Sequence, residues 1–191
     1  MKKVSLIFLS LGMIIATQAW CMGPAKSFPP LDTVPRVNLT QYLGQWYEIA
    51  RLPQWFEKEC VGVTAEYTLR EDGQIDVKNS CKKKTCDGPS KIANGVARVV
   101  DAVTLAQLKV SFFWPFEGDY WILELGPNYS YSVVGSPDRK TFWILSRTPT
   151  LAESTIQDII QRFTQKGFNL NPLERTTPCE VTSSPAKTLD L

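Results

Sequence analysis

The 191-residue chain contains no histidine. This absence excludes Ser-His-Asp and Cys-His catalysis, zinc sites built on histidine, and haem ligated through histidine. The chain also lacks a charge excess once residues 1–19 are set aside. Removing Lys2 and Lys3, the only charged residues there, from 21 basic side chains leaves 19, which equals the 19 acidic ones. A balanced charge gives no electrostatic footprint for nucleic acid.

A long apolar run is missing too. The longest one, Val4 to Ala16, is too short for a permanent transmembrane helix, which needs about 20 residues. With the basic start before it and the small residue Ala19 after it, the run predicts a secretory signal peptide over 1–19. The compact leader is typical of bacteria, so we expect a periplasmic protein. Cys21 is a possible lipidation site that would place the protein in the outer membrane as a lipoprotein, although Trp20 is a poor residue before such a cysteine.

The other four cysteines predict disulfides, since export leads to an oxidising compartment. The separation of Cys81 and Cys86 by four residues favours a local bridge across a turn, which leaves Cys60 to pair with Cys179. A zinc site is the alternative. It is disfavoured because the chain has no histidine and because Cys81 and Cys86 are spaced as C-x₄-C. We therefore expect no metal and no cofactor.

From Trp46 onward, short extended segments alternate with turn signals, a pattern typical of antiparallel strands. Asp72-Gly73, between two such segments, is a strong hairpin signal. Eight strands are predicted, over residues 46–52, 61–69, 74–79, 92–100, 106–113, 120–125, 129–134 and 141–146. Their connections are too short for parallel crossovers, so the strands form a meander.

A helix follows the last strand, because apolar residues recur at helical spacing between Pro149 and Phe163. Thr150 with Glu153 predicts a capping box, and Gly167 predicts the helix end. Thr40 is similarly predicted to cap a short turn before the first strand. The helix must lay its apolar stripe against the outside of the sheet.

Eight antiparallel strands leave two exposed edges unless the sheet closes. We therefore predict an all-β fold: an eight-stranded antiparallel up-and-down β-barrel with one C-terminal α-helix packed outside, and a sandwich of two sheets as the alternative. The predicted divisions of the chain are a signal peptide (1–19), an extended Pro-rich tether (20–37), the barrel domain (38–180) and a C-terminal tail (181–191).

Three blocks carry a family resemblance. Gly44-Gln-Trp-Tyr-Glu-Ile-Ala-Arg51, Gly135-Ser-Pro-Asp138 and Phe142-Trp-Ile-Leu-Ser-Arg-Thr-Pro149 resemble the conserved blocks of the lipocalins, in the correct order. The segments 108–116 and 120–123 resemble the bacterial lipocalin and apolipoprotein D-like branch. The resemblance implies a barrel open at one end that binds a small hydrophobic molecule. It also implies a structural floor in which Arg147 packs over Trp46 after Gly44, and it supports a bridge from Cys60 to the C-terminal tail.

Side chains alternate between lumen and exterior along a barrel strand. The predicted ligand-binding residues are the lumen candidates Glu48, Tyr67, Val77, Phe112, Trp114, Trp121, Tyr131 and Trp143. The alternative is that several of these aromatics only fill the barrel. Glu48 is the informative polar candidate, because a carboxylate inside an apolar barrel needs a partner. We expect an internal Arg or Tyr there, ahead of a ligand hydroxyl or a choline-like cation.

The predicted function is binding, storage or transport of a small hydrophobic ligand in the cell envelope, including a role in membrane maintenance. A fatty acid or lysophospholipid is the expected partner, with possible membrane association, no nucleic acid, and a monomeric or homodimeric state. We expect no enzymatic activity. The alternatives are a lipid-modifying enzyme of isomerase or de-epoxidase type, acting through an internal thiol or Glu48, and a binder of sterol, pigment or haem.

Overall fold

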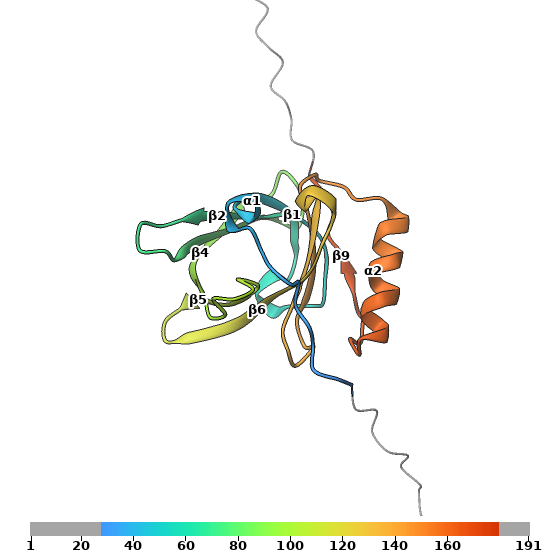
Figure 1. Ribbon diagram of the computed structural model, residues 1–191. Coiled ribbons are helices and arrows are strands. Elements are labelled where there is room, and N and C mark those ends of the chain that lie inside the picture. Colours follow the sequence, from blue (N-terminus) through green and yellow to red (C-terminus); the bar gives the residue numbers. More distant parts are fainter. Residues whose placement is uncertain (1–27, 180–191) are drawn as a thin grey trace, which may run out of the picture.

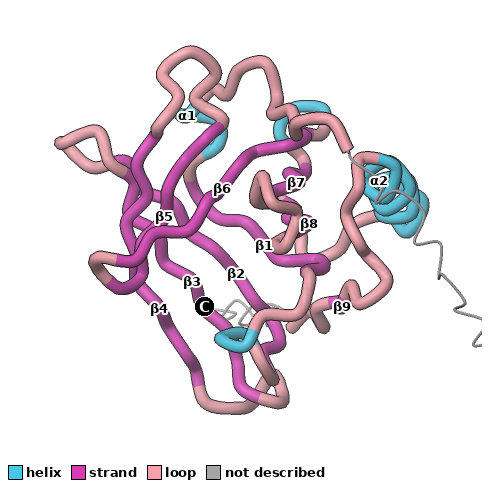
Figure 2. The backbone as a smooth tube through the Cα atoms, turned by 90° about the horizontal axis from the view of Figure 1, so that it is seen from below, coloured by secondary structure: helices cyan, strands magenta, loops and turns pink. Residues whose placement is uncertain are grey.

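The computed structural model describes residues 28–179, and eight of its strands close into one antiparallel barrel. Neighbours in the chain are neighbours in the sheet, and the barrel closes because β1 pairs with both β8 and β2. The predicted up-and-down barrel is confirmed, and the sandwich is wrong (Figures 1 and 2). The barrel strands are β1 (Gly44–Arg51), β2 (Cys60–Leu69), β3 (Ile75–Lys83), β4 (Ser90–Val99), β5 (Gln107–Phe113), β6 (Phe116–Leu125), β7 (Tyr131–Gly135) and β8 (Phe142–Ser146).

Helix α2 (Glu153–Gln165) stands outside the barrel, as predicted (Figure 1). Its buried residues Ile156, Ile159 and Phe163 pack on the outer faces of β7 and β8. The helix starts later than the predicted cap Thr150: Ala152 is the N-cap and makes no side-chain capping bond. Gly167 ends the helix, with a φ of +93° that suits glycine.

One end of the barrel is sealed by α1 (Leu39–Tyr42) and the start of β1. Asn38, rather than the predicted Thr40, caps α1 by accepting from the backbone N–H of Gln41. Trp46 is fully buried, and the Arg147 guanidinium carbon lies 3.7 Å from the centroid of its indole ring. Arg147 also donates to four backbone carbonyls, those of residues 41, 42, 43 and 45. This end is therefore closed by packing and hydrogen bonds together.

The described part of the predicted tether, residues 28–37, is extended but docked on the barrel. Val34 donates its backbone N–H to Ile122, and Val37 donates to Thr104. Leu31 and Val37 are buried in the two main apolar clusters. The predictions for the signal peptide, for Cys21 and for residues 181–191 lie outside the described residues.

The four described cysteines form two disulfides, but the predicted pairing is wrong. Cys60 pairs with Cys81, and Cys86 pairs with Cys179. The first bridge joins neighbouring strands β2 and β3 beside an irregularity in their pairing. The second joins the β3–β4 connection to the C-terminal segment, which also accepts a bond from Gly62 N–H at Thr177. Proximity in sequence favoured Cys81–Cys86, whereas the β2–β3 pairing brings Cys81 close to Cys60, and the C-terminal segment brings Cys179 to Cys86.

The remaining elements are short. They are the 3₁₀ turns η1 (Trp55–Glu57) and η2 (Pro127–Tyr129), and β9 (Glu174–Arg175), which pairs with the end of β1. Within residues 28–179, no helix is long and apolar enough to cross a membrane.

Candidate ligand cavity

The barrel encloses a cavity of about 570 Å³. Every second residue of the surrounding strands faces it, as the pleat of a strand requires. The rows on β2 to β5 are mainly apolar: Val63, Ala65 and Tyr67; Ile75 and Val77; Ala93 and Ala97; Leu108, Val110 and Phe112. The volume lies within the range of 300–1,000 Å³ that is usual for small-molecule sites.

Five of the eight predicted lumen residues line this cavity: Glu48, Tyr67, Val77, Phe112 and Trp143. The other three, Trp114, Trp121 and Tyr131, do not. Trp114 lies at the tip of the β5–β6 hairpin, where 86% of its surface is exposed. The prediction that Trp114, Trp121 and Tyr131 face the lumen is therefore wrong. For the five residues that do line the cavity, a role in ligand binding stays a prediction.

Trp121 and Tyr131 point outward, into the layer between the barrel and α2. Tyr131 donates its hydroxyl to Glu124, which also pairs with Arg162 of the helix. Because α2 covers the outer faces of β6, β7 and β8, outward positions there include large apolar side chains such as Trp121 and Tyr131. The sequence therefore does not distinguish the inward from the outward residues of these strands. The inward residue of the Tyr120-Trp121 pair is Tyr120, as Gly118 two positions earlier also is.

A hydrogen-bonded group of hydroxyls forms the inner end of the cavity. Tyr120 bonds to Tyr42 at 2.7 Å and to Tyr67 at 2.9 Å, and Tyr42 bonds to Ser132 at 3.1 Å. Burial raises the pKa of Tyr42 to about 12 and raises the pKa values of Tyr67 and Tyr120 as well. These hydroxyls therefore stay protonated, and the inner end of the cavity is polar but uncharged.

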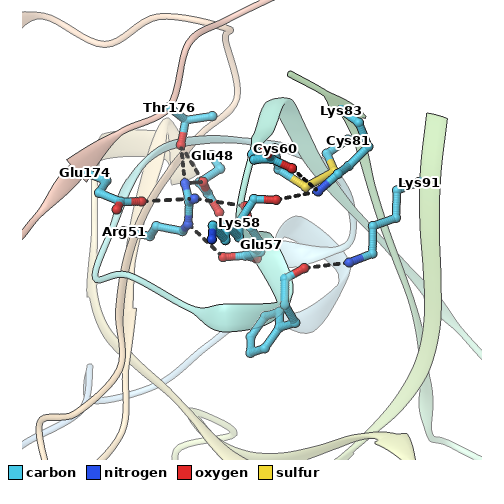
Figure 3. The surroundings of a disulfide bond; sticks show 12 residues. Glu48, Arg51, Glu57, Lys58, Cys60, Cys81, Lys83, Lys91, Glu174 and Thr176 are labelled. Atoms are coloured by element: carbon cyan, nitrogen blue, oxygen red, sulfur yellow. Dashed lines mark hydrogen bonds and ion pairs between the residues drawn. A yellow bond between two sulfur atoms is a disulfide. The ribbon is translucent and has the colours of Figure 1, made fainter. Parts of the chain in front are cut away.

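Two buried carboxylates lie toward the open end, on either side of Arg51 (Figure 3). Nη1 of Arg51 donates to Glu48 at 3.0 Å, and its Nε lies 3.1 Å from Glu57 in an ion pair without hydrogen-bond geometry. Glu174 adds a third carboxylate at 3.2 Å from Nη2. Thr176 donates its hydroxyl to Glu48. The internal partner expected for Glu48 is thus Arg51, whose side chain reaches it across an irregularity in the β1–β8 pairing.

One guanidinium cannot balance three carboxylates, and the pKa values reflect this. Burial raises the pKa of Glu57 from an ordinary 4.5 to about 7, and the charge of Glu48 adds to the effect. Burial likewise raises the pKa of Glu48, opposed by Thr176 and Arg51. Trp143 donates its indole N–H to Glu57 at 3.4 Å, which links the acidic group to the cavity wall.

The turn η1 is tied across the rim by cations that bind its backbone. Arg51 donates to the carbonyl of Glu57 at 3.1 Å, and Lys91 donates to the carbonyl of Phe56 at 2.6 Å. Lys83 donates to the carbonyl of Lys58 (Figure 3). These bonds hold Trp55 and Phe56 at the cavity entrance, which both residues line. Sequence reasoning missed Glu57, because a short turn has no periodicity from which inward and outward residues can be told. It also missed Arg51, which follows an irregularity in the β1–β8 pairing, and the two lysines at the ends of β3 and β4.

A closed eight-stranded barrel with an apolar cavity and an external helix defines a class of proteins that enclose small hydrophobic molecules. A family model described as "Lipocalin-like domain" matches residues 37–178. The chain belongs to the lipocalin family.

Curated relatives share most of the chain. "Outer membrane lipoprotein Blc" of Vibrio cholerae is 42% identical over 154 residues, covering 80% of this chain and 88% of that protein. The protein of the same name from Escherichia coli K12 is 41% identical over 160 residues, covering 82% and 89%. "Apolipoprotein D" of Bos taurus is 35% identical over 147 residues, covering 73% and 74%.

Among solved structures, insecticyanin from the tobacco hornworm Manduca sexta is similar in fold. Its TM-score is 0.64 at 19% identity, with 81% of this chain and 87% of that chain covered. At this identity the likeness supports the barrel architecture alone.

Proposed function

We propose that this protein binds and carries a single-chain lipid, a fatty acid or a lysophospholipid, in the bacterial cell envelope. The observation that carries the proposal is the cavity of about 570 Å³ with its apolar walls on β2 to β5. Burial of an acyl chain there gains roughly 0.8 kcal/mol for each methylene group removed from water.

The two ends of the cavity differ in chemistry, which favours one orientation of such a ligand. The inner end offers only neutral hydroxyls, those of Tyr42, Tyr67 and Tyr120. The entrance carries the ionisable groups Glu57 and Lys91 and is open to solvent. A charged head group is costly to bury without a partner, so the head lies at the entrance and the acyl chain points to the inner end.

The relatives support the envelope as the location, since three of them are named outer membrane lipoproteins in Vibrio cholerae and Escherichia coli. We propose a periplasmic location for a mature chain that starts after Ala19, and an outer-membrane location if Cys21 is lipidated. Mass spectrometry of the mature N-terminus decides between the two.

The enzymatic alternative requires a reactive group in the cavity. Cys60 and Cys81 both line the cavity but are joined in a disulfide, so neither supplies a thiol. Glu48 is held by Arg51 and Thr176. We therefore retain the binding function. Absorbance of the purified protein above 300 nm checks the remaining alternative, a pigment or haem.

Fluorescence titration tests the proposal with two matched variants. Trp143 lines the cavity, whereas Trp121 packs under α2 outside it. Titration with hexadecanoic acid or a C16 lysophospholipid is expected to change the emission saturably. The change should shrink in Trp143→Phe and persist in Trp121→Phe. Absence of saturable binding for both lipids would refute the carrier function, and equal loss in both variants would refute the site.

A further inference from the structure

The rim of the barrel carries a group of exposed aromatic side chains that the cavity alone does not require. Phe113, Trp114 and Phe116, on the β5–β6 hairpin, are 77%, 86% and 72% exposed, and Trp55 on η1 is 88% exposed. Phe56 packs edge-on against Trp55 with ring centroids 5.7 Å apart. We call these five residues the aromatic rim.

Both segments of the aromatic rim lie at one opening. Trp55 and Phe56 line the cavity from η1, and Phe113 and Phe116 line it from the opposite connection. The sealed end of the barrel, around Trp46 and Arg147, has no comparable exposed aromatic within residues 28–179. Exposed apolar groups of this size mark interaction sites when they gather in one place.

Lysines lie on the η1 side of the aromatic rim. Lys58 follows η1, and Lys82, Lys83 and Lys84 lie at the end of β3, with Lys91 at the start of β4. The exposed acids of these two segments are Glu59 and Asp87, against five lysines. The acids of the β5–β6 hairpin, Glu117 and Asp119, are each paired with a cation, Arg98 and Lys109. The backbone contact from Lys84 N–H to Glu59 shows that the two segments touch. Lys58 and Lys84 take part in no ion pair within the described residues.

Exposed aromatic residues beside Lys58 and Lys84 match the interface of a bilayer that contains anionic phospholipid. Tryptophan rings prefer the headgroup level, where an apolar body and a polar tip are both accommodated. Lysines near the surface bind the negative lipid charge. The aromatic rim also surrounds the entrance of the apolar cavity, and a bilayer is the partner that meets the apolar and the basic parts and also supplies an acyl chain to that entrance.

We propose that the open end of this barrel docks on an anionic phospholipid bilayer, with the aromatic rim inserted at the headgroup level and Lys58 and Lys84 on the lipid phosphates. The cavity entrance then faces the membrane, so that an acyl chain passes between bilayer and barrel without crossing water. This goes beyond carriage of a lipid, and it does not depend on Cys21.

Flotation with liposomes tests the proposal on the exported chain carrying Cys21→Ser, which removes any attached lipid. Vesicles of phosphatidylethanolamine with 30% phosphatidylglycerol serve as the anionic membrane, and phosphatidylcholine vesicles as the neutral one. Trp114→Ser is expected to weaken binding to both by about tenfold or more, because an aromatic ring no longer leaves water. Trp114 does not line the cavity, so lipid titration of this variant should match the wild type.

A second variant tests the contribution of the lysines. Lys58→Gln/Lys84→Gln is expected to weaken binding to the anionic vesicles by about 25-fold, or fivefold for each lysine at about 1 kcal/mol. Binding to neutral vesicles should stay the same. Two matched controls act at the sealed end: Val103→Ser changes another exposed apolar side chain, and Arg70→Gln removes another positive charge. Both should float like the wild type.

Three results would overturn the proposal. The first is that the wild type binds neither kind of vesicle. The second is that Val103→Ser weakens flotation as much as Trp114→Ser does. The third is self-association that Trp114→Ser abolishes without any vesicle binding, which would assign the rim to a second copy. Val77→Trp separates this proposal from the carrier function, because it fills the cavity and should leave flotation unchanged.

Discussion

Replacement of Glu57 by glutamine should change how the stability of the barrel depends on pH. Glu57 is buried beside Glu48, with Arg51 shared between them at 3.0 Å and 3.1 Å. Burial raises the pKa of Glu57 to about 7. The folded protein therefore holds a proton between about pH 4.5 and 7 that the unfolded chain releases. Stability is highest below this window and falls as the pH rises through it.

The size of the effect follows from the difference in pKa. About 1.4 kcal/mol for each pKa unit gives up to about 3 kcal/mol between pH 5 and pH 8. Urea unfolding at both pH values measures it. From pH 5 to pH 8, the free energy of unfolding of the wild type should fall by on the order of 2–3 kcal/mol more than that of Glu57→Gln. The Glu57→Gln variant should still lose some stability over this interval, because burial also raises the pKa of Glu48. This loss should be smaller than that of the wild type.

Glu59→Gln is the matched control, since Glu59 lies on the same loop but its carboxylate is half exposed beside Lys83. It should keep the wild-type dependence on pH. If stability instead rises from pH 5 to pH 8, or if Glu57→Gln and the wild type lose equal amounts, the account of this acidic group is wrong.

Further predictions concern the framework. Trp46→Ala should lower the free energy of unfolding by about 3–5 kcal/mol, measured by thermal melting; a variant that melts like the wild type but loses lipid would mean that the floor and the entrance are reversed. Peptide mapping without reductant should recover Cys60 linked to Cys81 and Cys86 linked to Cys179, whereas a Cys81–Cys86 peptide would contradict the structure. Removing the Cys86–Cys179 bridge by serine substitution should cost about 4–5 kcal/mol, and removing the Cys60–Cys81 bridge about 3, because the first closes the longer loop.

The sequence predicted the barrel well, because β2 to β5 have one face toward the cavity and one toward solvent. Val77 and Tyr67 could be placed inward from that alternation alone. The floor could be predicted through the family blocks, which pair Trp46 with Arg147 across a hundred residues. The alternation disappears on β6 and β7, where α2 buries the outer face, and there Trp121 and Tyr131 were placed on the wrong side.

Other features depend on three-dimensional position that local patterns do not contain. The pairing of Cys60 with Cys81 follows from the register of β2 and β3, not from spacing along the chain. Glu57 lies in a loop without periodicity, and its partner Arg51 turns inward only because the β1–β8 pairing is irregular after Glu48. The hydrogen-bonded hydroxyls at the inner end of the cavity belong to Tyr42, Tyr120 and Ser132, which come from three separate elements.

Native mass spectrometry of the protein with a C16 lysophospholipid tests the central claim, that the cavity of the barrel holds one single-chain lipid. Wild type should bind one lipid for each chain. Val77→Trp places an indole in the cavity and should abolish this binding. Asp76→Trp is its matched control, because it places the same indole on the outer face of β3, where the Asp76 side chain is exposed, and should bind like the wild type. Equal binding by Val77→Trp and the wild type would contradict the claim that the lipid lies inside the barrel.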